Sequence, residues 1–461
     1  MDPATTARSI FVVSDLHIGG AYDPEKPDER GFRMCTRARA LADFVESLPK
    51  LAAYETIELI INGDFIDFLA ETRDQKFWSY HGAEAVSLLD TILDPLRRPQ
   101  EAFFFAALRA HVLAGRHLTI LIGNHDVELA LPAVQQRLAD ALGGPRPNLR
   151  FLEAHNYTIG DIYIEHGNRF DPWNYVDPTH IRSLCDGSLT QFRPPAGSEL
   201  VRQVITPLKR AYPFIDLLKP EIGAAIPVLL ALAPSSRGNL LRIVRLWSAQ
   251  LASRTNVHEA VTRASGSAGP PATESGNELD RLVAEVLGGD AERRAFEAAV
   301  RDVQNGNQIV QAAGLGETLG WLALLLGAPN RLKALHQALG ALHRDLSLLP
   351  NIETDEQIVR AAEARADGLR WIILGHTHLA KSVQLSPTRT YLNSGTWTDL
   401  IPFPTWLLDG EAGRARLQDF LESLQDPGRI DGLVDFRPNY IHIEFDGTRA
   451  ERCTLEPSAE R

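Results

Sequence analysis

The sequence predicts an α/β protein with a large, mainly α-helical insertion, and two observations support this. Short runs rich in β-branched and aromatic residues alternate with helix-like segments early in the chain, and such runs return near its end. From about residue 181 to 350 these runs are missing, and Leu, Ala and Arg dominate long helix-compatible stretches. Alternating strands and helices are typical of a layered α/β domain, so the helical block interrupts such a domain.

Seven segments are expected to form strands, and a polar or glycine-containing loop follows most of them. They are IFVV at 10–13, IELII at 57–61, LTILI at 118–122, IYIE at 162–165, WIIL at 371–374, TYLN at 390–393 and IHIEF at 441–445. Helices are expected at 33–48 and 101–114, where apolar residues recur at spacings of three and four.

At 461 residues the chain exceeds one ordinary core, so two or three lobes are expected. We expect residues 1–180 to form the first part of the α/β core, 181–350 the helical insertion, and 351–461 the second part of the core.

The composition favours a soluble globular protein without a nucleic-acid partner. Hydrophobic residues make up 44% of the chain and charged residues 23%, and the formal net charge of −12 disfavours binding through phosphate contacts. The three cysteines, Cys35, Cys185 and Cys453, are far apart, which excludes a disulfide framework and a thiolate zinc site. Because no secretory signal is visible at the start, we expect a cytoplasmic protein.

The longest apolar runs lie at 222–234 and 319–329. Both are shorter than the ~20 residues that a membrane span needs, so we expect no transmembrane segment. They could form the core of the insertion, line a pocket, or make peripheral contact with a membrane.

Residues able to bind metals or transfer protons follow five of the expected strands. They are Asp15 and His17 in SDLHIGG, Asp64 and Asp67 in NGDFID, Asn124, His125 and Asp126 in IGNHDVE, His166 in IEHGNRFD, and His376 and His378 in GHTH. The carboxyl ends of strands are where α/β sheets form their sites. Oxygen and nitrogen ligands without sulfur suit Mn²⁺, Fe or Zn²⁺.

In their order, these motifs resemble the calcineurin-like metallophosphoesterases, whose pattern is D-x-H, G-D-x-x-D, G-N-H-[DE], H and G-H-x-H. The resemblance covers residues 10–180 and 370–400 and implies a layered α-β-β-α sandwich with two divalent transition-metal ions, Mn²⁺ most readily. It implies one ion held by Asp15, His17, Asp64 and His378. It implies a second ion held by Asp64, Asn124, His166 and His376, with the Asp64 carboxylate bridging the two.

The resemblance also implies a reaction, in which a hydroxide that bridges the two metals attacks a phosphodiester or a diphosphate. His125 matches the family histidine that stabilises the transition state or protonates the leaving group, and Asp67 matches the acid that orients it. Asp67 could instead cap a following helix. A phosphomonoesterase and a non-catalytic metal-binding scaffold remain alternatives.

The substrate stays open, as a small-molecule or lipid-related phosphoester. SDLH and the acid after HG resemble UDP-2,3-diacylglucosamine diphosphatases, but these usually carry Arg in place of His125 and lack so large a helical block. Asn168, Arg169 and Asp171 could contact substrate phosphate or form a salt-bridged turn. Asn393 and Gly395 resemble the turn that the family places beside its metals. The insertion is expected to cover the metal centre.

Overall fold

The computed structural model describes most of the predicted core. The described residues are 6–71 apart from 24 and 26–29, 82–189 apart from 153–155 and 172–173, short pieces between 194 and 232, residues 332, 335 and 336, and 368–458 apart from 403, 405 and 407–409. Two compact units are present, the first from 1–213, 350–400 and 435–461, and the second from 214–349 and 401–434. Most of 181–350 falls outside the described residues, so the proposed domain boundaries stay predictions.

The first unit contains a six-stranded mixed sheet in the order β13-β12-β1-β2-β3-β4. Its strands are β1 (Arg8–Val13), β2 (Ile57–Asn62), β3 (His117–Leu121), β4 (Leu149–Phe151), β12 (Asn439–Phe445) and β13 (Ala450–Pro457). β1 to β4 run parallel, whereas β12 is antiparallel to β1. Every residue of β1 and β2 is buried, which explains why most of their residues are apolar on both faces.

A second mixed sheet of five strands has the order β5-β6-β8-β10-β9. Its strands are β5 (Asn156–Ile159), β6 (Ile162–Glu165), β8 (Trp371–Leu374), β9 (Lys381–Ser386) and β10 (Arg389–Asn393). β6, β8 and β10 run parallel in the middle, and β5 and β9 form antiparallel edges. This sheet therefore joins segments from before and after the predicted insertion.

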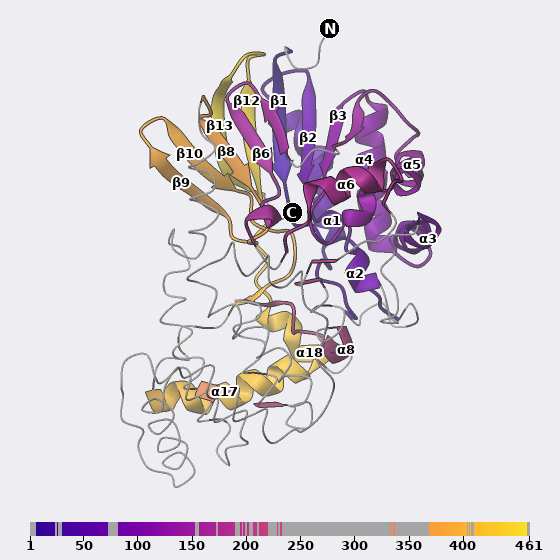
Figure 1. Cartoon of the computed structure of the whole chain (residues 1–461). Coiled ribbons are helices and arrows are strands. Elements are labelled where there is room, and N and C mark those ends of the chain that lie inside the picture. The colour runs from indigo at the N-terminus through magenta and orange to yellow at the C-terminus, as the bar shows by residue number, and fades with distance from the viewer. Residues whose placement is uncertain are drawn as a thin grey trace, which may run out of the picture. The chain divides into compact units, whose positions relative to one another are not determined.

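The two sheets share one apolar core, because Ile10 and Ile60 of the first sheet cluster with Ile164 and Ile373 of the second. The other face of the first sheet packs against helices, which lie beside β2 and β3 and away from β8 to β10 (Figure 1). These helices are α1 (Ala38–Leu51), α3 (Gly82–Leu93), α4 (Pro99–Leu113) and α5 (Pro132–Ala141). The predicted α/β class is confirmed, as are all seven predicted strands.

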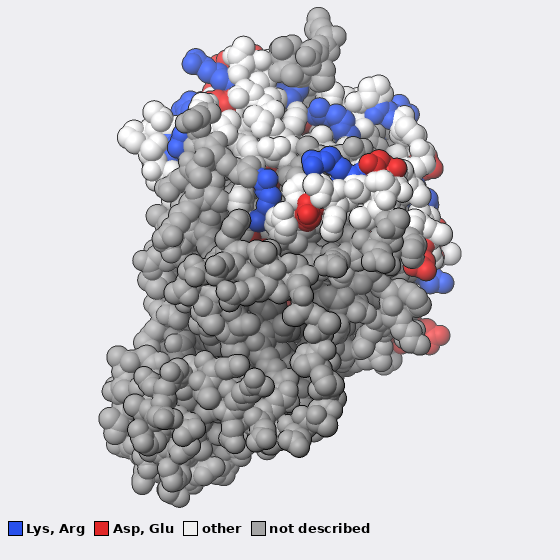
Figure 2. Space-filling view, viewed as in Figure 1, with Lys and Arg blue, Asp and Glu red and all other residues white. Residues whose placement is uncertain are grey.

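Short elements connect these layers in the first unit. They are α2 (Phe68–Glu71), η2 (Val127–Ala130), η3 (Asn168–Phe170), α6 (Pro178–Cys185) and α8 (Thr206–Lys209). On the described part of the face in Figure 2, Lys and Arg side chains are interspersed with Asp and Glu side chains.

The described elements of the second unit are few. They are α17 (Gly410–Gln425), α18 (Pro427–Ile430), η8 (Asp431–Leu433), and the strands β7 (Leu218–Lys219) and β11 (Ile401–Pro402), which pair in parallel. Among the residues that the structure describes, no helix has the length and apolar character to cross a membrane.

Candidate metal centre

The predicted ligands gather because the strands that precede them end at the same edge of the two sheets. Asp15 follows β1 and Asp64 follows β2, and these two strands are parallel. His166 follows β6 and His376 follows β8, which are parallel in the second sheet. Backbone hydrogen bonds link these ends, from Gly375 N to the carbonyl oxygen of His166 at 2.7 Å and from Asp15 N to that of Gly63 at 3.2 Å.

The side chains form three overlapping groups whose ligand atoms all lie within 4.8 Å of one another in each group. The groups are Asp15, His17 and His378; His17, Asp64 and His125; and Asp64, His166 and His376. Because His17 and Asp64 each belong to two groups, the three form one continuous cluster. This buried Asp and His cluster could hold metal ions.

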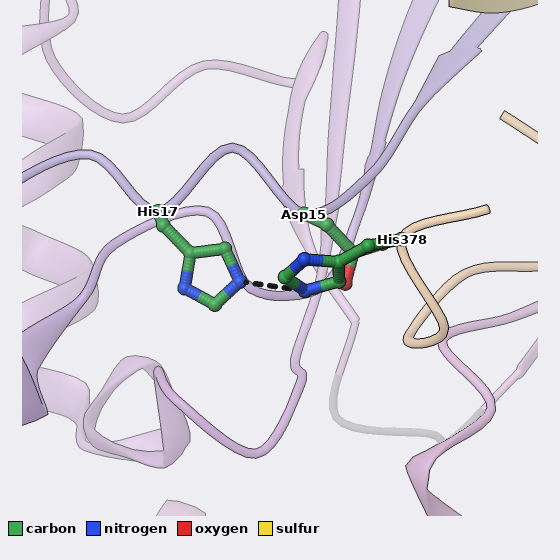
Figure 3. A group of neighbouring side chains, drawn as sticks. All are labelled: Asp15, His17 and His378. Atoms are coloured by element: carbon green, nitrogen blue, oxygen red, sulfur yellow. Dashed lines mark hydrogen bonds and ion pairs between the residues drawn. The ribbon is translucent and has the colours of Figure 1, made fainter. Parts of the chain in front are cut away.

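Distances in the first group fit ligands of a single ion. His17 Nε2 lies 3.2 Å from His378 Nε2, and His378 Nε2 lies 3.3 Å from Asp15 Oδ1 (Figure 3). Two nitrogen ligands about 2.1 Å from one metal ion and about 100° apart would be about 3.2 Å from each other. The ring nitrogens of His17 and His378 are thus at the separation that a shared cation requires.

His166 fits the role of a ligand in the other group. Its Nδ1 donates to the carbonyl oxygen of Asn62 at 2.8 Å, so Nε2 carries the lone pair of the neutral ring. That Nε2 lies 3.2 Å from Asp64 Oδ2. A lone pair facing a carboxylate is favourable only when a proton or a metal cation lies between them.

Asn124 lies in the loop that surrounds Asp64. Its side chain is buried, and its Oδ1 has no hydrogen-bond partner within the described part of the chain. Its neighbour His125 donates its backbone N–H to Asp64 Oδ1 at 2.8 Å. A buried amide oxygen without a donor is costly, and a metal ion would satisfy it.

The carboxylates of this cluster are balanced by imidazoles. Burial raises the pKa of Asp15, but the charge of His378 and its hydrogen bond, together with the charge of His166, outweigh burial and lower this pKa to about 2. Burial also raises the pKa of Asp64, but the charges of His166 and His125 hold it well below its usual range. For His166, burial lowers the pKa, but the Asp64 carboxylate outweighs this and raises it to about 10.

Among the described residues, Asp15, Asp64 and Asp67 form ion pairs with histidines and none with Lys or Arg. Buried carboxylates need compensating positive charge. In this cluster that charge comes from protonated imidazoles or from bound cations, and the same ligands cannot bind both.

The backbone is strained at five of the predicted ligands. Within the described part of the chain, the non-glycine residues with positive φ are Asp15 (56°), His17 (44°), Asp64 (49°), His376 (70°) and His378 (59°). A left-handed conformation costs roughly 1–2 kcal/mol for a residue with a Cβ. Strain of this kind clusters at functional sites, where the surrounding structure holds it in place.

Asp67 contacts two imidazoles and also caps a helix. Its Oδ1 accepts from the backbone N–H of Ala70 at 3.0 Å, at the start of α2, and lies 3.2 Å from His125 Nδ1. Its Oδ2 lies 3.4 Å from His17 Nδ1. Burial raises the pKa of Asp67, but the charges and hydrogen bonds of His125 and His17 together outweigh burial and hold this pKa well below the usual range. Capping and orientation of His125 therefore occur together.

Glycines allow the loops to approach one another at two points. A Cβ on Gly63, whose φ is +79°, would lie 2.5 Å from the His166 ring. A Cβ on Gly123 would lie 2.1 Å from Asp64 Oδ1. Any side chain at these positions would displace a predicted ligand.

Two residues near the cluster have structural contacts. Asp126 accepts from the backbone N–H groups of Phe65 at 2.7 Å and Gly123 at 2.6 Å, and so ties two ligand loops together. Burial, with the nearby Asp64 charge, raises the pKa of Asp126 to about 7. Arg169 forms an ion pair with Glu165 at 2.8 Å, as expected for a salt-bridged turn.

The turn after β10 braces the two histidines of GHTH. Asn393 Nδ2 donates to the carbonyl oxygen of Gly375 at 2.9 Å, and Gly395 N donates to Asn393 Oδ1 at 2.8 Å. Two supporting groups were not predicted, namely the Asn62 carbonyl and Thr396, whose hydroxyl donates to the Asp15 carbonyl oxygen at 2.6 Å. Thr396 could have been noticed because it directly follows the segment from Asn393 to Gly395 in the sequence. The role of the Asn62 carbonyl could not, because no sequence pattern identifies a backbone carbonyl.

No model of a known protein family matches the chain, and no curated protein matches it either. Any inference about function therefore depends on the site itself.

Proposed function

We propose that the chain is a metal-dependent phosphoester hydrolase of the calcineurin-like metallophosphoesterase type. The observation that carries this proposal is the left-handed backbone of five predicted ligands at strand ends, within one buried Asp and His cluster. A fold that merely needed turns at these positions would use glycine or asparagine, which adopt this conformation at lower cost. Aspartate and histidine at these positions point to a requirement for their side chains.

The proposal includes the α-β-β-α sandwich. Three of its four layers are supported by the contacts of the described residues. The two sheets share an apolar core, and helices pack on the outer face of the first sheet. The helical insertion, its position over the metals and any peripheral membrane contact concern residues mostly outside those described, and they remain predictions.

Two divalent transition-metal ions are part of the proposal, Mn²⁺ most readily and Fe or Zn²⁺ as alternatives. Asp15, His17, Asp64 and His378 would hold one, and Asp64, Asn124, His166 and His376 the other. Such ions supply Lewis acidity, which neutralises phosphoryl oxygens and lowers the pKa of attacking water. Asp64 suits the shared position because its Oδ2 lies 3.7 Å from His17 Nε2, a proposed ligand of one ion, and 3.2 Å from His166 Nε2, a proposed ligand of the other.

His125 is proposed to act on the leaving group. Its Nδ1 lies 3.2 Å from Asp67 Oδ1. Because an ionised carboxylate can only accept a hydrogen bond, Nδ1 carries a proton, and this hydrogen bond fixes the orientation of the ring. In the imidazolium form, Nε2 also carries a proton, and it can give this proton to the leaving oxygen as the phosphorus–oxygen bond breaks, which leaves the ring neutral. The His125 side chain is 19% exposed, whereas Asp67 is 2% exposed, so the histidine is the member of the pair that solvent and substrate can reach.

The substrate class proposed is a phosphodiester or a diphosphate of a small or lipid-related molecule. The test is hydrolysis of bis-nitrophenyl phosphate, nitrophenyl phosphate and a pyrophosphodiester by purified protein with Mn²⁺, Zn²⁺ or Fe²⁺. We expect metal-dependent cleavage of the diester or the pyrophosphodiester, its loss in Asp64→Asn, and its retention in the control Asp177→Asn. A protein that binds the metals but cleaves none of these esters would contradict the proposal and favour a non-catalytic scaffold.

A further inference from the structure

The turn after β6 is folded by hydrogen bonds among its own residues. It begins at Gly167, whose φ is 108°. Asp171 N donates to the carbonyl oxygen of Asn168 at 3.1 Å, and Asn174 N donates to that of Asp171 at 3.0 Å. Asn168 Nδ2 closes the turn by donating to the carbonyl oxygen of Asn174 at 3.0 Å. The side chain of Asp171 therefore projects from a defined backbone.

The Asp171 carboxylate meets the ring of His376. Its Oδ2 accepts from Asn174 Nδ2 at 2.7 Å and lies 3.1 Å from His376 Nε2. An ionised carboxylate can only accept, so this contact places the proton on Nε2 and leaves the lone pair on Nδ1. From the other side, His376 N donates to Asp15 Oδ2 at 3.0 Å. Both the backbone and the ring of His376 are thus fixed by carboxylates.

Asp171 does not belong to the ligand group itself. The group that contains Asp64, His166 and His376 does not include it, and the Asp171 side chain is 29% exposed. The same pattern holds for His166, whose Nδ1 donates to the backbone carbonyl of Asn62. An acceptor on one ring nitrogen orients a histidine ligand and increases the basicity of the other nitrogen.

We propose that Asp171 is a positioning residue that holds His376 as the Nε2–H tautomer and leaves Nδ1 as its metal-binding nitrogen. This inference depends on the proposed metal centre. The segment from His166 to Asp171 would then have two tasks. His166 would bind the second ion, and Asp171 would orient His376, the other histidine ligand of that ion.

The first measurement is the tautomer of His376, by ring-nitrogen NMR on metal-free protein with isotope-labelled histidine, assigned with His376→Gln. The Nε2–H form should dominate in the wild type, and its share should fall in Asp171→Ala. The second measurement is metal binding by titration calorimetry with Mn²⁺ and with Zn²⁺. Asp171→Ala should lower the affinity for one of the two ions by roughly 10- to 100-fold and leave the affinity for the other ion unchanged.

Asp171→Asn keeps an acceptor without the charge, so it should fall between the wild type and Asp171→Ala. The matched control is Asp177→Asn, since Asp177 lies in the following segment and accepts from Thr179 N at 2.7 Å, a bond that Asn can also accept. An unchanged tautomer in Asp171→Ala would overturn the proposal. The proposal would also be overturned if Asp171→Ala lost hydrolysis while the His376 tautomer and the metal affinity stayed unchanged, because the carboxylate would then act on the substrate. A wild type that binds no metal would refute the proposed function, whereas the tautomer measurement would still decide this inference.

Discussion

Replacement of Asp64 by Asn tests the shared ligand with little other change. Asparagine adopts the left-handed conformation readily, so the φ of 49° at this position should persist. Its Oδ1 can also accept the hydrogen bond that His125 N donates at 2.8 Å. The substitution therefore removes one negative charge and one oxygen ligand, while the loops keep their backbone.

The size of the effect follows from the number of ions that each carboxylate is proposed to hold. Asp64 is proposed to hold two ions and Asp15 one. A site at 100-fold excess of ligand over its Kd stabilises the folded state by about 2.7 kcal/mol. For a domain of about 200 residues this raises the melting temperature by roughly 5–10 °C per site. With saturating Mn²⁺, the melting temperature of the wild type should rise by about twice this per-site value. The rise should be about half as large for Asp15→Asn, and Asp64→Asn should show almost none.

The assay combines metal content per chain, measured by mass spectrometry after gel filtration, with melting curves taken with Mn²⁺ and with chelator. Expected contents are two ions for wild type and for the control Asp177→Asn, one for Asp15→Asn, and close to zero for Asp64→Asn. Two ions retained by Asp64→Asn would refute the shared position. An equal loss in Asp15→Asn and Asp64→Asn would refute the assignment of Asp15 to one ion only.

Three further predictions follow from individual contacts. His125→Ala should keep its metals but lose roughly 10²-fold in hydrolysis rate, and less with a nitrophenolate leaving group; equal losses for good and poor leaving groups would contradict proton donation. Burial lowers the pKa of His111 to about 4 from 6.5, so the folded state binds fewer protons between these values. The stability that its neutral ring contributes is complete above pH 6.5 and is lost as the pH falls toward 4. Relative to His111→Gln, wild type should therefore lose about 1 kcal/mol in the free energy of unfolding between pH 7.5 and 5.5, and a pH-independent difference would contradict this. Gly123→Ala should weaken metal binding, because its Cβ would lie 2.1 Å from Asp64 Oδ1, whereas a Cβ on Gly432 meets nothing within 4 Å; equal binding by Gly123→Ala and Gly432→Ala would show that the loop can adjust.

The central strands could be predicted from sequence, and the edge strands could not. β1 and β2 are buried on both faces, so most of their residues are apolar and no alternation with exposed polar residues is seen. β9 and β13 were missed because their exposed or half-buried positions carry residues such as Gln384 and Glu451, which break the apolar run. Strand propensity depends on the neighbours that a residue packs against, and edge strands have fewer of them.

The site shows a similar division between side-chain identity and backbone geometry. The identity of the ligands was predictable because Asp and His side chains follow strands whose carboxyl ends converge. The order of strands in the second sheet was not predictable, since β6 and β8 are parallel neighbours from distant segments. The contact between Asp171 and His376 depends on the path of the backbone from Gly167 to Asp171, which the sequence HGNRFD does not specify.

Strain and rigidity in this site have a common origin in the sheets. Asp15 and His17 adopt left-handed conformations in the loop after β1, and that loop is held by bonds from Leu16 N and His17 N to the Asp64 carbonyl oxygen, both at 2.9 Å. His376 is held by its bond to Asp15 Oδ2, and Gly375 by its bond to the carbonyl oxygen of His166. Asp15, His17, Asp64 and His376 are therefore each hydrogen-bonded to a loop that follows another strand. Because the strained conformations depend on contacts between strand ends, a mutation that separates the sheets should disturb the ligands even where it touches none of them.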